Sequence, residues 1–214
     1  MVFPITHTIL RAHIMDKILD VMRRDGVARV TFASGEMLKV PAALYLERRL
    51  RPGETIDPSA YRQFMLQRGY PHALEMAVKY LALRERSVQE IRTRLRRSCY
   101  DEAVITRVLD TLDAHALVSD TRFAEQWVHH RSRQYGRRRI AQELRLKGVG
   151  GEEAAQALSA LTAEDEQTQA DRQAQKLARR MNDRQKVMNA LVRRGYDFAV
   201  ARRAAERALA EPEA

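Results

Sequence analysis

The stretch RSRQYGRRRI, residues 131 to 140, holds five arginines in ten positions, and three of them are consecutive. Guanidinium groups bind phosphate and carboxylate through paired hydrogen bonds, so these side chains suit an anionic partner. Arg137, Arg138 and Arg139 also fall at the predicted start of a helix, where free backbone N–H groups attract anions. The alternative is an ordinary solvated helix face.

Positive charge at a helix start slightly destabilises the helix, so its presence there suggests a functional reason and favours the binding interpretation. Cations there oppose the helix dipole, by about 0.3–1 kcal/mol per group at most. We therefore predict a first group of partner- or DNA-binding residues, which are Arg131, Arg133, Arg137, Arg138, Arg139, Arg145 and Lys147. A second group has a weaker case because it nears a helix C-terminus, where cations are favourable, and it comprises Arg92, Arg94, Arg96 and Arg97.

The composition points the same way. The chain has 214 residues and a net charge of +10, which indicates a polyanion or an acidic partner. Arginine far outnumbers lysine, although codon usage in a GC-rich genome would raise arginine without any functional reason. The arginine clustering is not explained in that way. Residues 121–163 are the most basic of the three helical segments, with 8 basic and 4 acidic residues.

Other chemistry is absent from the sequence. Cys99 is the only cysteine, which excludes an internal disulfide and a zinc knuckle. Glu125 and His129 share a predicted helix face, but one such pair occurs readily by chance, and Trp127 fits an apolar stripe. There is no glycine-rich phosphate loop with its lysine. We expect no catalytic, cofactor or metal site, no membrane span, and a cytoplasmic protein.

The elements that position these residues repeat along the chain. Three stretches align, at offsets of 49 and 47 residues: SVQEIRTRLRRSCYDEAVITRVLDTL, GRRRIAQELRLKGVGGEEAAQALSAL and DRQKVMNALVRRGYDFAVARRAAERA. Each aligned column has a physical role. The columns are helix N-caps (Ser87, Gly136, Asp183), an apolar stripe (Ile91, Leu95; Ile140, Leu144; Val187, Leu191), helix ends (Cys99, Gly148, Gly195), apolar residues (Tyr100, Val149, Tyr196), second starts (Asp101, Gly150, Asp197) and inner-face residues (Val108, Ala157, Ala204).

A further helix precedes each aligned stretch, so the repeating unit has three helices. Its inner face would carry Met76, Tyr80 and Leu83 in the first unit, Phe123, Trp127 and either His130 or Arg131 in the second, and Ala170, Ala174 and Leu177 in the third. Units of this size bury little alone, so neighbours should pack on each other.

The first 72 residues differ from the repeats. Val30, Phe32, Leu38 and Val40 alternate around Ser34-Gly35, which predicts a two-stranded hairpin. Helices are expected near 12–24, 41–50 and 59–68. The predicted fold is mostly α: tandem three-helix repeats in an elongated array, with a small N-terminal module that contains a β-hairpin. The predicted modules are 1–72, 73–120, 121–163 and 164–214.

The segment DTRFAEQWVHHRSRQYGRRRIAQELRLKGV, residues 120–149, resembles the signature of the RecX family of recombination regulators. YLALRERSVQEIRTRL and LVRRGYDFAVARRA match the flanking repeats, so the resemblance covers about 73–210. Cys99 stands where glycine is expected, and Arg137 where proline is common. The resemblance implies a cytoplasmic bacterial protein that binds the RecA filament and lowers its ATP hydrolysis, strand exchange and repressor cleavage.

Two hypotheses follow. The first is a non-catalytic monomeric regulator that binds and inhibits RecA–DNA filaments, with contact to single- or double-stranded DNA. The alternative is a general nucleic-acid-binding protein that competes for single-stranded DNA. Such binding usually adds exposed aromatic side chains, and aromatic residues make up only 6% of this chain.

Overall fold

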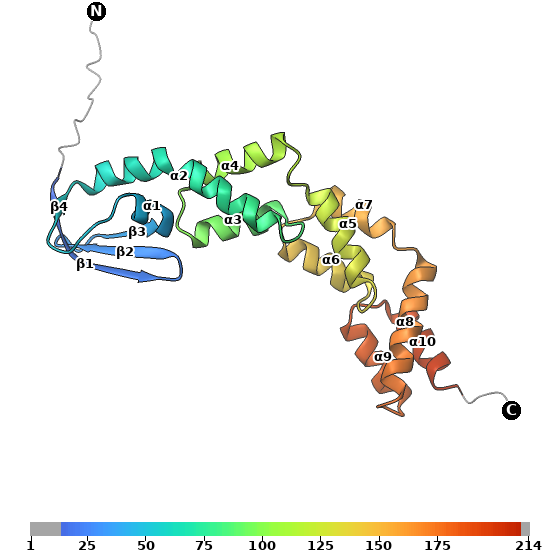
Figure 1. Cartoon of the computed structure of the whole chain (residues 1–214). Coiled ribbons are helices and arrows are strands. Elements are labelled where there is room, and N and C mark those ends of the chain that lie inside the picture. Colours follow the sequence, from blue (N-terminus) through green and yellow to red (C-terminus); the bar gives the residue numbers. More distant parts are fainter. Residues whose placement is uncertain (1–13, 211–214) are drawn as a thin grey trace, which may run out of the picture. The chain divides into compact units, whose positions relative to one another are not determined.

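The computed structural model describes residues 14–210, and these residues form two compact units. Unit 1 contains residues up to 79 together with 92–111, and unit 2 contains 80–91 together with 112–210. The described part is mostly helical, with one small sheet near its N-terminal end (Figure 1). None of its helices is both long and apolar enough to span a membrane.

The sheet has four antiparallel strands in the order β3-β2-β1-β4. They are β1 (Asp16–Arg24), β2 (Val27–Phe32), β3 (Met37–Pro41) and β4 (Thr55–Ile56). The hairpin predicted around Ser34-Gly35 is confirmed, and Val30 pairs with Leu38 in it.

The helix expected near 12–24 is wrong within the described residues, because these residues form β1. Ile14, Ile18 and Met22 recur every four residues and so imitate a helix face. The following Asp25-Gly26 pair has positive φ at both residues, 52° and 78°. This is the backbone of a tight hairpin turn, and it pairs β1 with β2.

Helix α1 (Ala42–Glu47) lies within the range expected for it. Helix α2 (Pro58–Leu81) is longer than expected and runs through Pro71, so it joins the helix predicted at 59–68 to the first helix of the first repeat. Its buried face carries Ala73 and Ala77, whereas Leu83 is 78% exposed. The expectation that Leu83 lies on an inner face is therefore wrong: α2 ends at Leu81, before the stripe reaches it.

The tandem three-helix pattern is confirmed. The remaining helices are α3 (Val88–Arg97), α4 (Glu102–Ala114), α5 (Asp120–Arg131), α6 (Arg137–Leu146), α7 (Gly151–Ser159), α8 (Ala163–Ala178), α9 (Arg184–Arg193) and α10 (Phe198–Ala208). The predicted caps hold: Ser87 and Asp183 accept backbone N–H groups at the starts of α3 and α9. The division into four modules stays a prediction.

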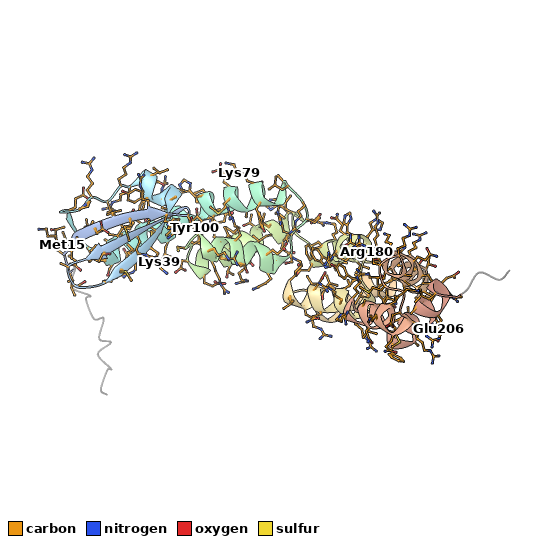
Figure 2. All side chains as sticks on the ribbon, turned by 90° about the horizontal axis from the view of Figure 1, so that it is seen from below. Met15, Lys39, Lys79, Tyr100, Arg180 and Glu206 are labelled. Atoms are coloured by element: carbon orange, nitrogen blue, oxygen red, sulfur yellow. The ribbon has the colours of Figure 1, made fainter. Side chains whose placement is uncertain are left out.

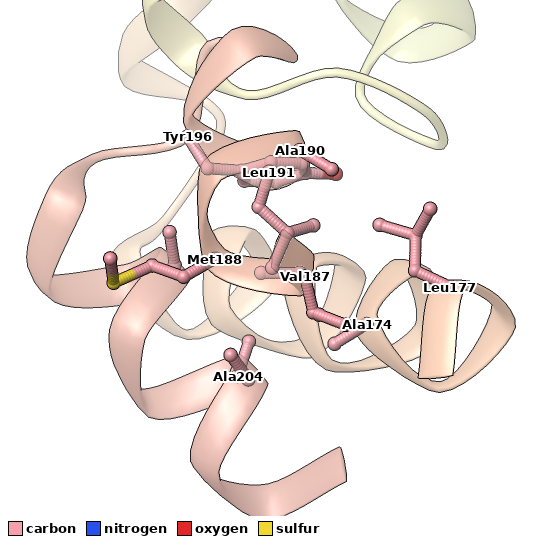
Figure 3. Close-up of a cluster of buried hydrophobic side chains, with 11 residues drawn as sticks. Ala174, Leu177, Val187, Met188, Ala190, Leu191, Tyr196 and Ala204 are labelled. Atoms are coloured by element: carbon pink, nitrogen blue, oxygen red, sulfur yellow. The ribbon is translucent and has the colours of Figure 1, made fainter. Parts of the chain in front are cut away.

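The core of the last repeat shows how the aligned columns work. Val187 and Leu191 on α9 are fully buried and meet Ala174 and Leu177 of α8 and Ala204 of α10 (Figure 3). Five buried alanines on the two flanking helices let the backbones approach closely, so a small repeat acquires a dense core: Ala170 and Ala174 on α8, and Ala201, Ala204 and Ala205 on α10.

Candidate functional site

The start of α6, where the consecutive arginines lie, is covered by the last repeat. The backbone N–H of Gly136 donates to the carbonyl of Arg194 (3.0 Å), and that of Arg138 donates to the carbonyl of Gly195 (3.2 Å). The N–H of Arg137 donates to a carboxylate oxygen of Glu166 (2.9 Å). The anion-binding position predicted here for an outside partner is therefore filled by the chain's own carboxylate.

The side chain of Arg137 completes this junction. Its guanidinium donates to the carbonyl of Leu158 (3.0 Å) and to the carbonyl of Leu161, and it lies 3.7 Å from the Glu166 carboxylate. These carbonyls belong to the end of α7 and the turn that follows it, and the carbonyl of Leu158 also accepts the backbone N–H of Leu161 (3.1 Å). Arg137 thus joins α6, α7 and α8.

Arg138 makes a more peripheral contact. It pairs with Asp197 at 2.5 Å, but the two side chains are 70% and 47% exposed. Asp197 also accepts the N–H of Ala199 and so caps α10. An exposed pair of this kind contributes little to stability.

Glu143 is the centre of a second network. Its carboxylate accepts two bonds from Arg131 (2.7 and 2.5 Å), one from Arg139 (3.2 Å) and one from the indole N–H of Trp127 (3.2 Å). The hydrogen bonds from Arg131, opposed by partial burial, lower the pKa of Glu143. The carboxylate therefore stays ionised and neutralises the cations around it.

Aromatic rings contact the cations of this network. The guanidinium carbons of Arg131 and Arg139 each lie 4.2 Å from the centre of the Tyr135 ring. The Lys147 ammonium lies 4.3 Å from the centre of the Trp127 ring. Cations at this distance from an aromatic ring are attracted to it. Much of the positive charge in residues 131–147 is thus bound by carboxylates and aromatic rings of the chain itself.

A similar junction occurs at the start of α3. The N–H of Val88 donates to Asp120 (2.9 Å), and the Ser87 hydroxyl donates to the carbonyl of Lys147 (2.7 Å). The Lys147 ammonium also forms an ion pair with Glu90 at 2.7 Å. At both α3 and α6, the first helical N–H is bound by an acid from the first helix of the next repeat.

Glycine is required where these junctions close. A side chain at Gly148 would place its Cβ 2.4 Å from Cβ of Gln89, and at Gly195 2.4 Å from Cβ of Arg139. Cys99 has the same left-handed backbone, with φ 62°, but it lines a cavity of about 250 Å³ in unit 1. This cavity leaves room for the Cys99 side chain, which the tight contacts at Gly148 and Gly195 would not.

The other predicted residues are distributed as follows. Arg92 and Arg96 both pair with Glu102 across α3 and α4, in unit 1, and Arg94 is exposed on α3. Arg133 is exposed and approaches His129 (3.4 Å). Arg97 and Arg145 are exposed, and no ion pair joins either to another residue of the described range 14–210.

The structure therefore gathers Arg131, Arg139 and Lys147 into one network and leaves Arg133 and Arg145 exposed on the same repeat. Two acids that bind these arginines were not predicted: Glu143 in this network, and Glu166 at the Arg137 junction. Glu143 stands four residues after Arg139, which is a readable helical pairing. Glu166 lies 29 residues after Arg137, and no local signal marks it. In the described part of the chain, no group of three or more His, Cys, Asp or Glu could hold a metal ion.

Comparisons with known proteins agree with this architecture. Residues 73–112 match the family model described as RecX, first three-helix domain, and residues 119–158 match RecX, second three-helix domain. The regulatory protein RecX of Amycolatopsis mediterranei is 42% identical over 103 residues, which are 47% of this chain and 59% of that protein. That of Mycobacterium sp. strain JLS is 35% identical over 136 residues, 58% of this chain and 74% of that protein.

Solved structures share the fold. A crystal structure of regulatory protein RecX superposes with a TM-score of 0.59 at 24% identity, and covers 86% of this chain and 96% of its own. RecX from Lactobacillus salivarius gives the same TM-score at 22% identity, over 65% of this chain and 96% of its own.

Proposed function

Because this chain belongs to the RecX family and is a RecX-type regulator, we propose that it binds RecA–DNA filaments and inhibits their recombinase, ATPase and co-protease activities. The proposal describes a non-catalytic cytoplasmic protein that acts as a monomer. The regulatory names of its relatives support the absence of catalysis. Binding to the RecA filament in particular is inferred from the family resemblance.

The repeated junction is the observation that supports binding to a large partner. The turn after α6 packs on the start of α3, and the turn after α9 packs on the start of α6. Both junctions use a left-handed glycine, a backbone carbonyl and an acid from the following repeat. The middle and last repeats, which both lie in unit 2, are joined in a fixed register and present an ordered surface, which lowers the entropic cost of binding an ordered partner.

Within this proposal the middle repeat makes contact through its exposed cations, Arg133 and Arg145. Arg131, Arg137 and Arg139 act mainly by holding the repeat and its neighbour in shape, because their guanidinium groups already have carboxylate or carbonyl partners. Arg92 and Arg96, paired with Glu102, are assigned the same supporting role in unit 1.

The second candidate is a protein that competes for single-stranded DNA. Such proteins stack bases on exposed aromatic rings. Here Tyr61, Phe32, Phe123 and Tyr196 are buried, and Phe198 is the one aromatic among the large exposed hydrophobic residues of the described range. The aromatic side chains therefore favour the regulator over a base-stacking competitor.

The test is the ATPase rate of RecA filaments on single-stranded DNA, titrated with this protein at several salt concentrations. The proposal predicts that substoichiometric protein slows the ATPase more than its occupancy of free DNA can explain. Adding excess unoccupied DNA should leave this inhibition in place. Inhibition that follows DNA occupancy and disappears with excess DNA would establish the competitor instead.

A further inference from the structure

A second cation-rich segment lies in the last repeat, in the C-terminal half of α8 and just beyond it. Residues 172–182 contain Arg172, Lys176, Arg179 and Arg180 and no acidic residue. All four side chains belong to exposed residues of the last repeat, in which Arg180 is labelled in Figure 2. Arg179 keeps helical backbone angles, φ −60° and ψ −20°, so the helical spacing continues through it.

Among the described residues, these four cations differ from Arg131, Arg137 and Arg139 because no carboxylate binds them. The two nearest acids are engaged elsewhere: Asp171 pairs with Arg207 (2.7 Å), and Asp183 pairs with Lys186 (3.6 Å). Within the described range 14–210, no side-chain hydrogen bond, ion pair or ring contact involves any of the four. Their charge is available to an outside partner.

Their spacing forms a stripe on one side of the helix. Positions 172, 176, 179 and 180 follow the i, i+4, i+7, i+8 pattern of a single face. The inner face is separate and carries Ala170 in the core, together with Ala174 and Leu177, which are labelled in Figure 3. Eight residues of helix span about 12 Å, over which one DNA strand presents about three or four phosphates. The number of cations matches.

The surroundings of the stripe identify the class of partner. Among the described residues, no large exposed hydrophobic side chain occurs between Leu146 and Val192, so α8 offers no apolar centre for a protein interface. The helix also has no aromatic residue on which a base could stack. What remains is positive charge at regular intervals, mostly as arginine, which suits phosphate.

The helix dipole explains only part of this arrangement. Cations in the last turn of a helix are stabilised by its negative end, which favours Lys176 and Arg179 without any partner. Arg172 lies two turns earlier, where the effect of the dipole has faded. The stripe therefore extends further than the dipole requires.

We propose that the α8 stripe, defined as Arg172, Lys176, Arg179 and Arg180, binds the phosphate backbone of nucleic acid without reading its sequence. This goes beyond the proposed function, because the contact needs no recombinase and uses residues outside the arginine-rich motif of the middle repeat. It places direct DNA contact on the last repeat.

The test is binding of a fluorescent 30-nucleotide DNA, single-stranded or duplex and without recombinase, to the full chain over a range of salt concentrations. The stripe variant is Arg172→Gln/Lys176→Gln/Arg179→Gln/Arg180→Gln. The control variant is Arg29→Gln/Lys39→Gln/Arg49→Gln/Arg51→Gln, which removes the same charge from four exposed residues of the N-terminal module whose side chains have no ion pair in the described structure.

We expect the stripe variant to lose affinity for DNA at least tenfold at low salt. The steepness of log affinity against log salt should also fall by about three, because each of the four lost phosphate contacts contributes about 0.7–0.9 to it. The control should keep its slope to within about one. Equal losses in both variants would overturn the proposal, because net charge alone would then explain binding. Unchanged DNA binding in the stripe variant would also overturn the proposal. So would a variant that loses binding to polyglutamate, used as an acidic-polypeptide probe, but keeps its binding to DNA.

Thermal melting of both variants checks that each is folded. If the quadruple variant does not fold, Arg172→Gln/Arg180→Gln replaces it, with Arg29→Gln/Lys39→Gln as its control. The slope should then fall by about one and a half in the stripe pair only. Failure of this test leaves the RecA proposal untouched, since no recombinase is present.

Discussion

The arginines of residues 131–139 and the cations of residues 172–180 look alike in the sequence but differ in the structure. Both segments are rich in arginine and free of acids. In the first, Glu143 and Glu166 come from outside the segment and bind its side chains or backbone. In the second, the flanking acids bind other residues. Charge density in a sequence therefore does not measure charge available to a partner.

The physical reason for the difference is position in the array of repeats. The start of α6 is covered by the repeat that follows, which supplies Glu166 and the Gly195 turn. The outer side of α8 faces away from the core formed with α9 and α10. The same residue type thus stabilises the fold in one place and remains available in the other.

The largest expected effect comes from adding a methyl group at the close-packed junction at the start of α6. Gly136→Ala would place a Cβ 2.4 Å from the backbone of Gly195 and Tyr196, which cannot yield as a side chain can. We expect a loss of unfolding free energy about 1–3 kcal/mol greater than in the control. Gly150→Ala is that control, because Gly150 is also an N-cap and a Cβ there meets nothing within 4 Å. Chemical denaturation compares the two, and equal losses would mean that the junction is not close-packed.

A smaller effect should follow from Arg137→Gln. The substitution removes the bonds to the carbonyls of Leu158 and Leu161 and leaves Glu166, whose side chain is only 10% exposed, without its cation. We expect a loss of about 2 kcal/mol. Arg138→Gln removes the same charge from an exposed pair and should cost no more than about 0.5 kcal/mol. Similar unfolding curves for the two variants would contradict the role of Arg137 as a structural clamp.

A pH-dependent effect is expected at Glu143, whose pKa is lowered mainly by the hydrogen bonds from Arg131. A lowered pKa in the folded state means that the stabilisation is present above the ordinary carboxyl pKa and is lost as the pH falls through the lowered value. Glu143→Gln should cost about 1 kcal/mol at pH 7, and its stability should fall less steeply toward acid than that of the wild type. Glu125→Gln, on an exposed residue of α5, is the control, and an unchanged pH profile in Glu143→Gln would refute the network.

The repeat pattern was predictable because its signals are local. N-caps at Ser87 and Asp183 and left-handed ends at Gly148 and Gly195 are set by residues within one or two turns. The strand β1 was missed for the opposite reason: its spacing imitates a helix, and only pairing with β2 decides its conformation. The Asp25-Gly26 turn was a readable signal for that pairing.

The candidate site was only partly predictable. The arginines of the middle repeat were found, but their partners were not, because Glu166 and the Gly195 turn reach them through tertiary packing. The same limitation hid the α8 stripe. Its segment has no more arginine than others, and its distinction is that Asp171 and Asp183 are bound elsewhere.

The most direct test of the difference between the two segments is a pair of variants that each remove two charges, with melting temperature and salt-dependent DNA affinity measured on both. Arg137→Gln/Arg139→Gln should melt several degrees lower, at about 2–4 °C per kcal/mol lost, and keep the wild-type salt slope. Arg172→Gln/Arg179→Gln should keep the melting temperature and lose about 1.5 from the slope. The account would be contradicted if the first variant kept its stability and lost the slope, while the second kept its DNA binding.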